Sequence, residues 1–421
     1  MDRIGRRRAG RAGGWLAVAT IALGAMAGGW LPAAAQSPDP AESSDAAGSP
    51  TADSLDATEQ EIAAALSGDD QSLQAYWAEA FPTFSDQPYH DPQGGFFPYN
   101  TGDPSGGGCS EDGETAAQNA MYCGKDESIT YDVTWLASLY DTWGPVGPLM
   151  LMAHEWGHHI QAVAGTPETS KAAELQADCY AGMYLGFLRD QEVLTDEDIA
   201  NGISVAYSIG DTAGSVTDWM DPEVHGLPNE RRQATGIGYV TGNGAYCAAY
   251  GDWQNDEPAA LFSDKSLRLE PFADPTPQED GSLSIELPDA QVLVWGDDFD
   301  PSTPAADQIG EALTASVAGA DTWTTSTPDT SWLETMGWGT GSGTRLTFTG
   351  EDENGNPTGG AAALQIDPSG TGELWVAWGA DTTDADVASQ EGDAAIDALA
   401  WGYCDPEAEV NANCLKDAPA S

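Results

Sequence analysis

Residues 148–165 read PLMLMAHEWGHHIQAVAG, an apolar segment in which two histidines stand four residues apart. Its apolar positions recur at helix-like spacings, and Gly165, with Pro167 just beyond it, indicates where the helix ends. His154 and His158 then share one face of the helix, with Cβ atoms about 5–6 Å apart, so both imidazoles can bind one metal ion. We therefore expect this helix to carry a metal site.

Glu155 completes the pattern His-Glu-x-x-His. Zinc accepts neutral imidazole readily, needs a third protein ligand, and in catalytic sites keeps its fourth position for water. Glu155 lies beside that position, where it can take a proton from the water and pass it to a leaving amine. His159 fits neither ligand position and is expected only to flank the helix. Three of the five histidines fall within six residues, so chance explains the pattern poorly.

The third ligand is expected from the next helix. Residues 169–190 read TSKAAELQADCYAGMYLGFLRD, with Thr169 or Ser170 as the N-cap. Glu174 and Asp178 are four residues apart and share one face, so one carboxylate can bind the metal while the other hydrogen-bonds a ligand imidazole. The residues alone leave open which does which. A pair of acids on a solvated helix is the alternative.

Similar patterns predict the other elements of the N-terminal half. Helices are expected over 195–211, where Thr195 and acidic residues favour a helix N-terminus, and over 229–242. A helical pattern covers 57–80, and the Gly/Pro-rich stretch 87–100 has room for a short strand. The 49 Gly and 26 Pro of the whole chain favour long loops and little extended helix.

After about residue 256 the pattern becomes that of a sheet. Short apolar or alternating runs separated by turn residues predict strands at 290–299, 343–350, 360–367 and 372–379, with helices at about 304–318 and 384–400. The expected fold class is therefore α+β. It consists of a mainly helical domain over 57–255 and a smaller, β-rich α+β accessory domain over 256–421, whose role the residues do not reveal.

The N-terminus has the three parts of a secretory signal peptide. Five Arg crowd the first eleven residues, an apolar run extends from Trp15 to about Trp30, and Ala33–Ala35 offers a small-residue cleavage site. We expect residues 1–35 to be removed and the mature protein to be secreted, without stable membrane insertion; an uncleaved anchor is the alternative. Residues 36–56 are mostly Pro, Ser, Ala and Asp, which predicts a disordered acidic linker.

The chain is strongly acidic, with 68 Asp and Glu against 14 Lys and Arg and a formal net charge of −54. A surface of that sign repels phosphate backbones and anionic membranes, which argues against nucleic-acid binding. Removal of the signal peptide takes away five Arg and one Asp, which makes the mature net charge −58. The acidity suits high salt, low pH or abundant divalent cations, or it only keeps an exported protein soluble.

All six cysteines lie after the signal peptide, an even number for an oxidising compartment. No Cys-x-x-Cys pair occurs, so structural disulfides are expected rather than a thiolate zinc site. Two pairs are close in sequence, Cys109 with Cys123 and Cys404 with Cys414. Pairing them leaves Cys179 with Cys247.

Together these motifs resemble the bacterial family of "putative neutral zinc metallopeptidases". The resemblance runs from Cys109 to about Gly242 and rests on Met121-Tyr122-Cys123, Ala153-His154-Glu155-Trp156-Gly157-His158-His159-Ile160-Gln161, Glu174-Leu175-Gln176-Ala177-Asp178-Cys179-Tyr180-Ala181-Gly182, Ser208-Ile209-Gly210-Asp211, His225-Gly226 and Glu230-Arg231. The Cys109 to Cys123 spacing is similar to that of the family, which favours that disulfide. Family members usually end soon after the last of these motifs, whereas this chain continues to residue 421.

The resemblance implies a zincin-like fold of the gluzincin kind and one catalytic Zn²⁺. It makes His154, His158 and Glu174 the metal ligands and Glu155 the general base. The Glu-x-x-x-Asp spacing is also similar to that of the CAAX prenyl endopeptidases, in which the Glu binds zinc and the Asp braces the site. This likeness supports Glu174 over Asp178 as the third ligand.

Three residues outside the motif remain to be interpreted. His225 is either a donor to the oxyanion beside the metal or a loop histidine with a structural hydrogen bond. Arg231 and Arg232 are rare basic residues and should have a carboxylate partner, more as a structural ion pair than as a substrate clamp.

The leading hypothesis is a secreted zinc metallopeptidase that acts on a peptide or protein substrate. A binding or scaffold protein of the cell envelope with structural zinc is one alternative, and it would need a fourth protein ligand. An amidase acting on wall-derived substrates is another. The sequence leaves open the cleavage preference and the oligomeric state.

Overall fold

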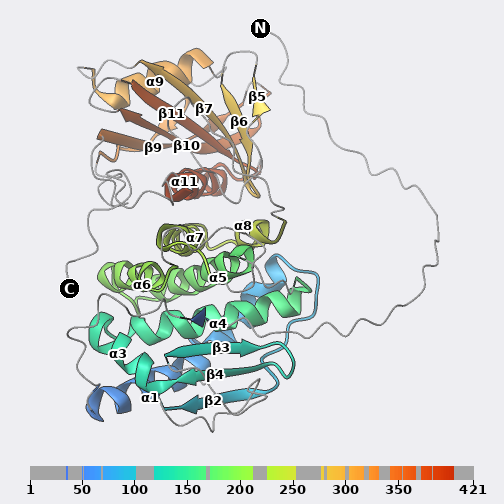
Figure 1. The fold of residues 1–421 in the computed structure, drawn as a ribbon. Coiled ribbons are helices and arrows are strands. Elements are labelled where there is room, and N and C mark those ends of the chain that lie inside the picture. The colour runs from blue at the N-terminus through green and yellow to red at the C-terminus, as the bar shows by residue number, and fades with distance from the viewer. Residues whose placement is uncertain are drawn as a thin grey trace, which may run out of the picture. The chain divides into compact units, whose positions relative to one another are not determined.

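The helix predicted at 148–165 is α4, Val146–Ala164, in the computed structural model. It ends at Gly165, whose φ of +81° is the left-handed conformation that glycine adopts without strain. The next helix is α5, Lys171–Asp190. Both are buried on almost every side, as their apolar composition requires. They form the centre of the N-terminal half of the molecule (Figure 1).

The structure describes residues 35–36, 50, 52–67, 70–100, 118–166, 171–211, 225–252, 276–278, 282–298, 303–316, 322–330, 342–352, 354–366, 371–381 and 383–402. Almost all of the predicted signal peptide, most of the predicted linker, the predicted N-caps Thr169 and Ser170, and the predicted boundary near residue 256 lie outside them. None of the described helices has the length and apolarity needed to cross a bilayer.

The remaining helices of this half surround α4 and α5. They are α1 (Ala52–Leu66), α2 (Leu73–Ala80), η1 (Phe81–Thr83), α3 (Val133–Trp143), α6 (Asp196–Ser208), α7 (Pro228–Thr241), α8 (Gly244–Ala248) and η2 (Ala249–Asp252). The N-terminus predicted at Thr195 is confirmed, because its side chain and that of Asp198 form a reciprocal capping box.

The linker prediction was wrong at its C-terminal end. Helix α1 begins at Ala52, inside the stretch assigned to the linker, and its Ser54 and Thr58 are buried together with Ile62. These residues are four apart and line one helix face. The Ser- and Asp-rich composition of residues 36–56 as a whole does not reveal such a buried face. Gln36, the first residue of the predicted linker, is not disordered either, because it pairs with Asn119 in a sheet.

A small four-stranded sheet lies against the helices. Its strands are β1 (Ala35–Gln36), β2 (Gly95–Tyr99), β3 (Asn119–Cys123) and β4 (Ser128–Asp132), in the order β1-β3-β4-β2. Strand β2 pairs parallel to β4, while β3 pairs antiparallel to β4. The strand expected within 87–100 is thus confirmed. Strand β3 lies next to α4 (Figure 1), which brings its backbone to the metal-site helix.

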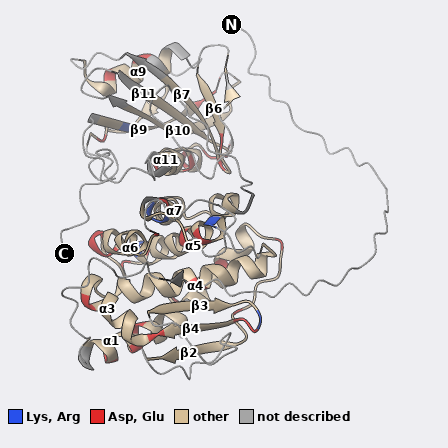
Figure 2. Ribbon diagram, viewed as in Figure 1, with Lys and Arg blue, Asp and Glu red and all other residues tan. Residues whose placement is uncertain are grey.

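Helices α5 and α7 approach each other at glycines. A Cβ atom on Gly182 would collide with the carbonyl oxygen of Thr235, and one on Gly238 would collide with that of Cys179. Gly157 plays the same part between α4 and α5, where a Cβ atom would lie 2.8 Å from the carbonyl oxygen of Ala177. These glycines let the helix backbones touch. In Figure 2, α5 and α7 also carry several of the basic residues of the described chain.

The second half contains an antiparallel seven-stranded sheet in the order β5-β6-β7-β11-β10-β9-β8. The strands are β5 (Thr276–Pro277), β6 (Leu283–Glu286), β7 (Ala290–Asp298), β8 (Thr324–Thr325), β9 (Ser342–Glu351), β10 (Pro357–Ile366) and β11 (Thr371–Gly379). Helices α9 (Ala305–Ser316) and α11 (Ala385–Gly402) cover its two faces (Figure 1). The four predicted strands and both predicted helices are confirmed.

Strand β10 shows why this sheet needs both helices. Ala362 and Leu364 belong to the core that contains Ile309 of α9, whereas Ala361 and Ala363, on the opposite face, belong to the core that contains Ile396 of α11. Successive side chains of a strand point to opposite faces, so a strand that is apolar at every position is buried on both sides.

The α+β class is confirmed, but the expectation of little extended helix was wrong. Helices α4 and α5 are 19 and 20 residues long. The glycine count misled because several glycines, among them Gly157, Gly182 and Gly238, lie inside helices at close backbone contacts. The division into two domains at residues 57–255 and 256–421 stays a prediction.

One guanidinium in the second half faces three carboxylates, and this predicts a pH effect. Arg345 lies 2.6 Å from Asp397, 3.4 Å from Asp393 and 3.7 Å from Asp329. Burial raises the pKa of Asp393 to about 6, although the Arg345 charge opposes the rise. A raised folded pKa gives stability that is present below the ordinary pKa of Asp and lost as pH rises through about 6.

We therefore expect Asp393→Asn to stabilise the protein at pH 7 by about 1–2 kcal/mol, after allowance for partial solvent screening, and to change little below pH 4. Thermal unfolding followed from pH 3 to pH 8 measures this. Glu311→Gln, on the exposed side of α9, is the control for loss of one negative charge. A difference between Asp393→Asn and wild type that does not vary with pH would contradict the assignment.

Candidate metal centre

The first two predicted ligands lie on α4 and the third on α5. His154 Nε2 is 3.3 Å from Glu174 Oε2, and His158 Nε2 is 3.5 Å from Glu174 Oε1. One ligand atom from each of the three residues lies within 4.8 Å of the others, so this cluster could hold a metal ion. All three side chains are buried. The helices can place them so close because Gly157 lets α4 and α5 touch.

The donor atoms themselves fit a metal ion. His154 Nε2 and Glu174 Oε2 are buried and have no hydrogen-bond partner. Unpaired buried polar atoms cost free energy, and two of them facing each other are explained if both bind a third species. Two imidazoles and one carboxylate form the ligand set of catalytic zinc, which leaves a fourth position open.

A hydrogen bond at Nδ1 orients each imidazole. His154 Nδ1 is 2.8 Å from Asp178 Oδ1, and His158 Nδ1 is 3.0 Å from Gln161 Oε1. Gln161 is held in turn, because its Nε2 donates to the carbonyl oxygen of Ala173 at 2.5 Å. Both rings therefore direct Nε2 toward Glu174. The geometry answers the question that the residues left open: Glu174 faces the Nε2 atoms, and Asp178 contacts the outer nitrogen of His154.

Arg231 of α7 fixes Asp178. Its Nε donates to Asp178 Oδ2 at 2.8 Å and its Nη2 to Oδ1 at 2.9 Å, while Nη1 donates to the Ile209 carbonyl oxygen at 3.3 Å. The predicted carboxylate partner of Arg231 is therefore Asp178. Arg232 is also buried, and burial lowers its pKa to about 10.

The electrostatic field of the carboxylates in this cluster favours positive charge at the imidazoles. Burial lowers the pKa of His154, but the charge of Asp178, the hydrogen bond to Asp178 and the close contact with the Glu174 carboxylate outweigh it and raise the pKa to about 10. Burial raises the pKa of Glu174, yet the charges of His158 and His154 hold it well below its usual range. The carboxylates thus stabilise positive charge where a metal ion would lie.

Glu155 lies next to the cluster and is completely buried. Its Oε2 accepts a hydrogen bond from the backbone N–H of Tyr122 on β3 at 2.7 Å, while its Oε1 is buried without a partner. Burial raises the pKa of Glu155, against the lowering effect of His154 and His158. A carboxyl group with one oxygen anchored, the other without a hydrogen-bond partner and a raised pKa is suited to receive and release a proton.

His159 points away from this cluster, as expected. Its Nδ1 is 3.2 Å from the Tyr122 hydroxyl, and its Nε2 is 2.7 Å from the carbonyl oxygen of His90. Burial lowers its pKa. It is a buried structural histidine that joins α4 to β3 and to the loop before β2.

His225 is buried in the segment before α7. Its backbone N–H donates to Asp211 Oδ2 at 2.7 Å, and its Nδ1 is 3.6 Å from Asp211 Oδ1. Burial raises the pKa of Asp211, but hydrogen bonds from His225 and Gly226 outweigh it and lower that pKa. These contacts agree with a structural hydrogen bond. The oxyanion role of His225 stays a prediction.

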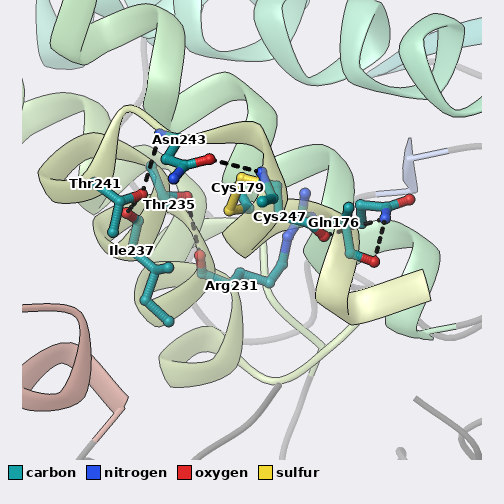
Figure 3. The surroundings of a disulfide bond; sticks show 10 residues. Gln176, Cys179, Arg231, Thr235, Ile237, Thr241, Asn243 and Cys247 are labelled. Carbon is teal, nitrogen blue, oxygen red and sulfur yellow. Dashed lines mark hydrogen bonds between the residues drawn. A yellow bond between two sulfur atoms is a disulfide. The ribbon is translucent and has the colours of Figure 1, made fainter. Parts of the chain in front are cut away.

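The disulfide predicted between Cys179 and Cys247 is confirmed. It joins α8 to α5 at the residue that follows Asp178. Gln176, also on α5, donates through its Nε2 to the Cys247 carbonyl oxygen at 3.1 Å (Figure 3). Cys123 is also disulfide-bonded. Cys109, its predicted partner, and the pair Cys404 and Cys414 lie outside the described residues.

Sequence reasoning missed several supports of the site. The backbone of Tyr122 was not expected, since β3 was not predicted and its approach to Glu155 is set by packing. Gln161 appeared only as a motif position without a structural role, and the ion pair expected of Arg231 had no named partner. The pair Lys171 and Glu230 was not singled out at all.

Comparisons with known proteins find relatives for part of this chain. Over 159 residues the chain is 28% identical to uncharacterized proteins of Mycobacterium tuberculosis and Mycobacterium bovis, an overlap of 31% of this chain and 54% of each relative. Over 172 residues it is 28% identical to the uncharacterized protein YpfJ of Escherichia coli, an overlap of 34% of this chain and 59% of the relative. The chain thus spans little more than half the length of the curated relatives it matches. No solved structure matches it.

The family comparison extends further along the chain. Residues 3–250 match the family described as "Putative neutral zinc metallopeptidase", a span that includes α4, α5 and α7 and every residue of the metal cluster. Because the match covers more than half of the 421 residues, the chain belongs to this family.

Proposed function

We propose that this protein is a secreted zinc-dependent metallopeptidase that hydrolyses peptide bonds with Glu155 as general base. One observation carries the proposal: two imidazole Nε2 atoms and the Glu174 carboxylate converge in a buried cluster with unpaired atoms, directly beside Glu155. His154, His158 and Glu174 would hold the metal, Asp178 and Gln161 would orient the imidazoles, and Arg231 would fix Asp178.

Zinc, when bound, supplies Lewis acidity, which polarises a carbonyl group and makes water more acidic. Glu155 accepts the proton of the attacking water on Oε1, while Tyr122 holds Oε2 in place. The water oxygen forms a bond to the carbonyl carbon. Glu155 then delivers the proton to the amine nitrogen as the C–N bond breaks, so the carboxylate is regenerated. Burial of Glu155 excludes bulk water from this transfer.

A catalytic metal fits the described residues better than a structural one. A structural zinc site has four protein ligands, whereas three metal-binding side chains meet in the part of the chain that the structure describes. The disulfide between Cys179 and Cys247 and the signal-like N-terminus support export. The net charge of −54 supports peptide substrates over nucleic acids.

A peptide-cleavage assay tests the proposal. The protein is incubated with a mixed library of unstructured peptides, alone, with a zinc chelator, and with zinc restored after chelation. We expect cleavage that stops with the chelator and returns with zinc. Tight zinc binding without cleavage of any peptide would refute the peptidase assignment and favour an amidase or an envelope-binding protein. Failure to bind zinc would refute the metal site itself.

A further inference from the structure

A second buried ion pair joins α5 to α7, and the reaction described above does not use it. Lys171 Nζ lies 2.6 Å from Glu230 Oε1, and the two side chains are only 3% and 1% exposed. Lys171 precedes Glu174 by three residues on α5, so it lies about one helical turn from the metal cluster. Glu230 is the neighbour of Arg231 on α7.

Stability alone explains such a pair poorly. Removing two charges from water costs several kcal/mol for each ion, and apolar residues of similar size often stabilise a protein equally well. A buried pair does fix position, because moving either charge away from the other removes a strong interaction that water does not replace. Glu230 is itself anchored, since its Oε2 accepts the backbone N–H of Leu227 at 2.8 Å in the first turn of α7. Lys171 therefore meets a carboxylate that is already in place.

The pair lies on one side of Glu174, and the ion pair of Asp178 with Arg231 lies on the other. Along α5 the cation Lys171 comes first and the anion Asp178 follows seven residues later. Along α7 the order is reversed, because the anion Glu230 directly precedes the cation Arg231. Sliding α5 by one turn, about 5.4 Å, would break both buried ion pairs. The two pairs thus select one axial register of α5 on α7.

That register controls the metal cluster. Glu174 is on the turn between the two pairs, and its oxygens must lie within about 3.5 Å of the Nε2 atoms of His154 and His158. Farther along α5, Gly182 meets α7 in a close backbone contact that fixes how near the helices lie. Close backbone contact sets the distance between helices, and the ion pairs set the position along the axis at the end that bears Glu174.

We propose that Lys171 and Glu230 form a positioning pair for the metal site, which holds Glu174 against the two histidines. The proposal rests on the proposed function only in that its readout is metal affinity. It assigns Lys171 no contact with substrate. Its consequence is that neutralising the pair weakens metal binding even where the fold is kept.

The test compares Lys171→Met with the double variant Lys171→Met/Glu230→Gln. Zinc affinity is measured by competition with a chelator, and stability of the metal-free protein by denaturant unfolding. Lys171→Met leaves Glu230 as a lone buried charge, so it should lower both quantities. The double variant removes that charge, and its Gln oxygen can still accept the Leu227 N–H. It should regain stability but remain about 10–100-fold weaker in zinc affinity.

Arg189→Met is the matched control on the same helix. Arg189 pairs with Asp196 at 3.0 Å, but the two side chains are 45% and 82% exposed, so the variant should change neither quantity. A double variant with the zinc affinity of wild type would overturn the positioning role and leave the pair merely structural. If Lys171→Met does not fold, the double variant decides alone; if the double variant fails to fold as well, the pair is needed for the fold and the positioning role is overturned. Absence of zinc binding by wild-type protein would instead refute the proposed function.

Discussion

A Glu155→Gln variant is expected to bind zinc as tightly as the wild-type protein and to lose about 10²–10⁴-fold in kcat for peptide hydrolysis. The change preserves shape, because the amide oxygen of Gln can accept the Tyr122 N–H that Glu155 Oε2 accepts now at 2.7 Å. It removes the function of the other oxygen, since an amide cannot take a proton from water. The effect should therefore appear in kcat while KM and metal content stay unchanged.

The measurement is steady-state hydrolysis of a peptide found in the library assay, with the zinc content of each preparation determined alongside. Glu197→Gln, an exposed substitution in the first turn of α6, controls for the loss of one negative charge. If Glu155→Gln keeps more than a tenth of wild-type kcat, Glu155 is not the general base. If it loses zinc, the anchored conformation of Glu155 supports the site as well as the reaction.

The second large effect is expected from Arg231→Met, which should lower the free energy of unfolding by about 3–5 kcal/mol. Arg231 is 1% exposed, and the substitution removes two hydrogen bonds from the fully buried carboxylate of Asp178. A buried carboxylate that keeps its charge without its main partner is strongly unfavourable. His154 still contacts Asp178, so we expect destabilisation of the fold rather than its complete loss.

Denaturant unfolding of the metal-free protein measures this effect. Arg189→Met, which removes the exposed partner of Asp196 on α5, should cost less than about 1 kcal/mol. Arg231→Met combined with Asp178→Asn should recover much of the loss, because the lone charge is gone. A stability of Arg231→Met within about 1 kcal/mol of wild type would show that Asp178 does not depend on this ion pair.

Prediction from the sequence succeeded wherever the signal is local. The end of α4 at Gly165 and the start of α6 at Thr195 depend on backbone conformation and capping within a few residues, and both are confirmed. The strands of the second sheet are likewise apparent from their apolar runs and turn residues. The start of α1 was misplaced because its apolar face depends on what packs against it. Strands β3 and β4 were missed although they pair with each other across a short turn. Nearly all of their residues are buried, so neither strand shows the alternation of apolar and polar residues that marks a half-buried strand.

The glycines show the limit of composition most clearly. A glycine count predicts loops, yet Gly182 and Gly238 lie in helices whose backbones touch. Nothing within a helix distinguishes a glycine that packs against a neighbour from one that weakens the helix. Only the arrangement of α5 against α7 reveals which it is, and that arrangement brings Arg231 to Asp178.

The chemistry of the metal cluster could be recognised from the chain because the spacing of His154 and His158 along one helix already places them on the same face. Which carboxylate faces the metal position, which backbone group anchors Glu155, and which cation holds Asp178 became clear only in three dimensions. Those relations join α4 to α5, β3 to α4, and α7 to α5. Helical periodicity relates residues a few positions apart, whereas contacts between elements depend on how buried surfaces fit together, and the local pattern does not encode that.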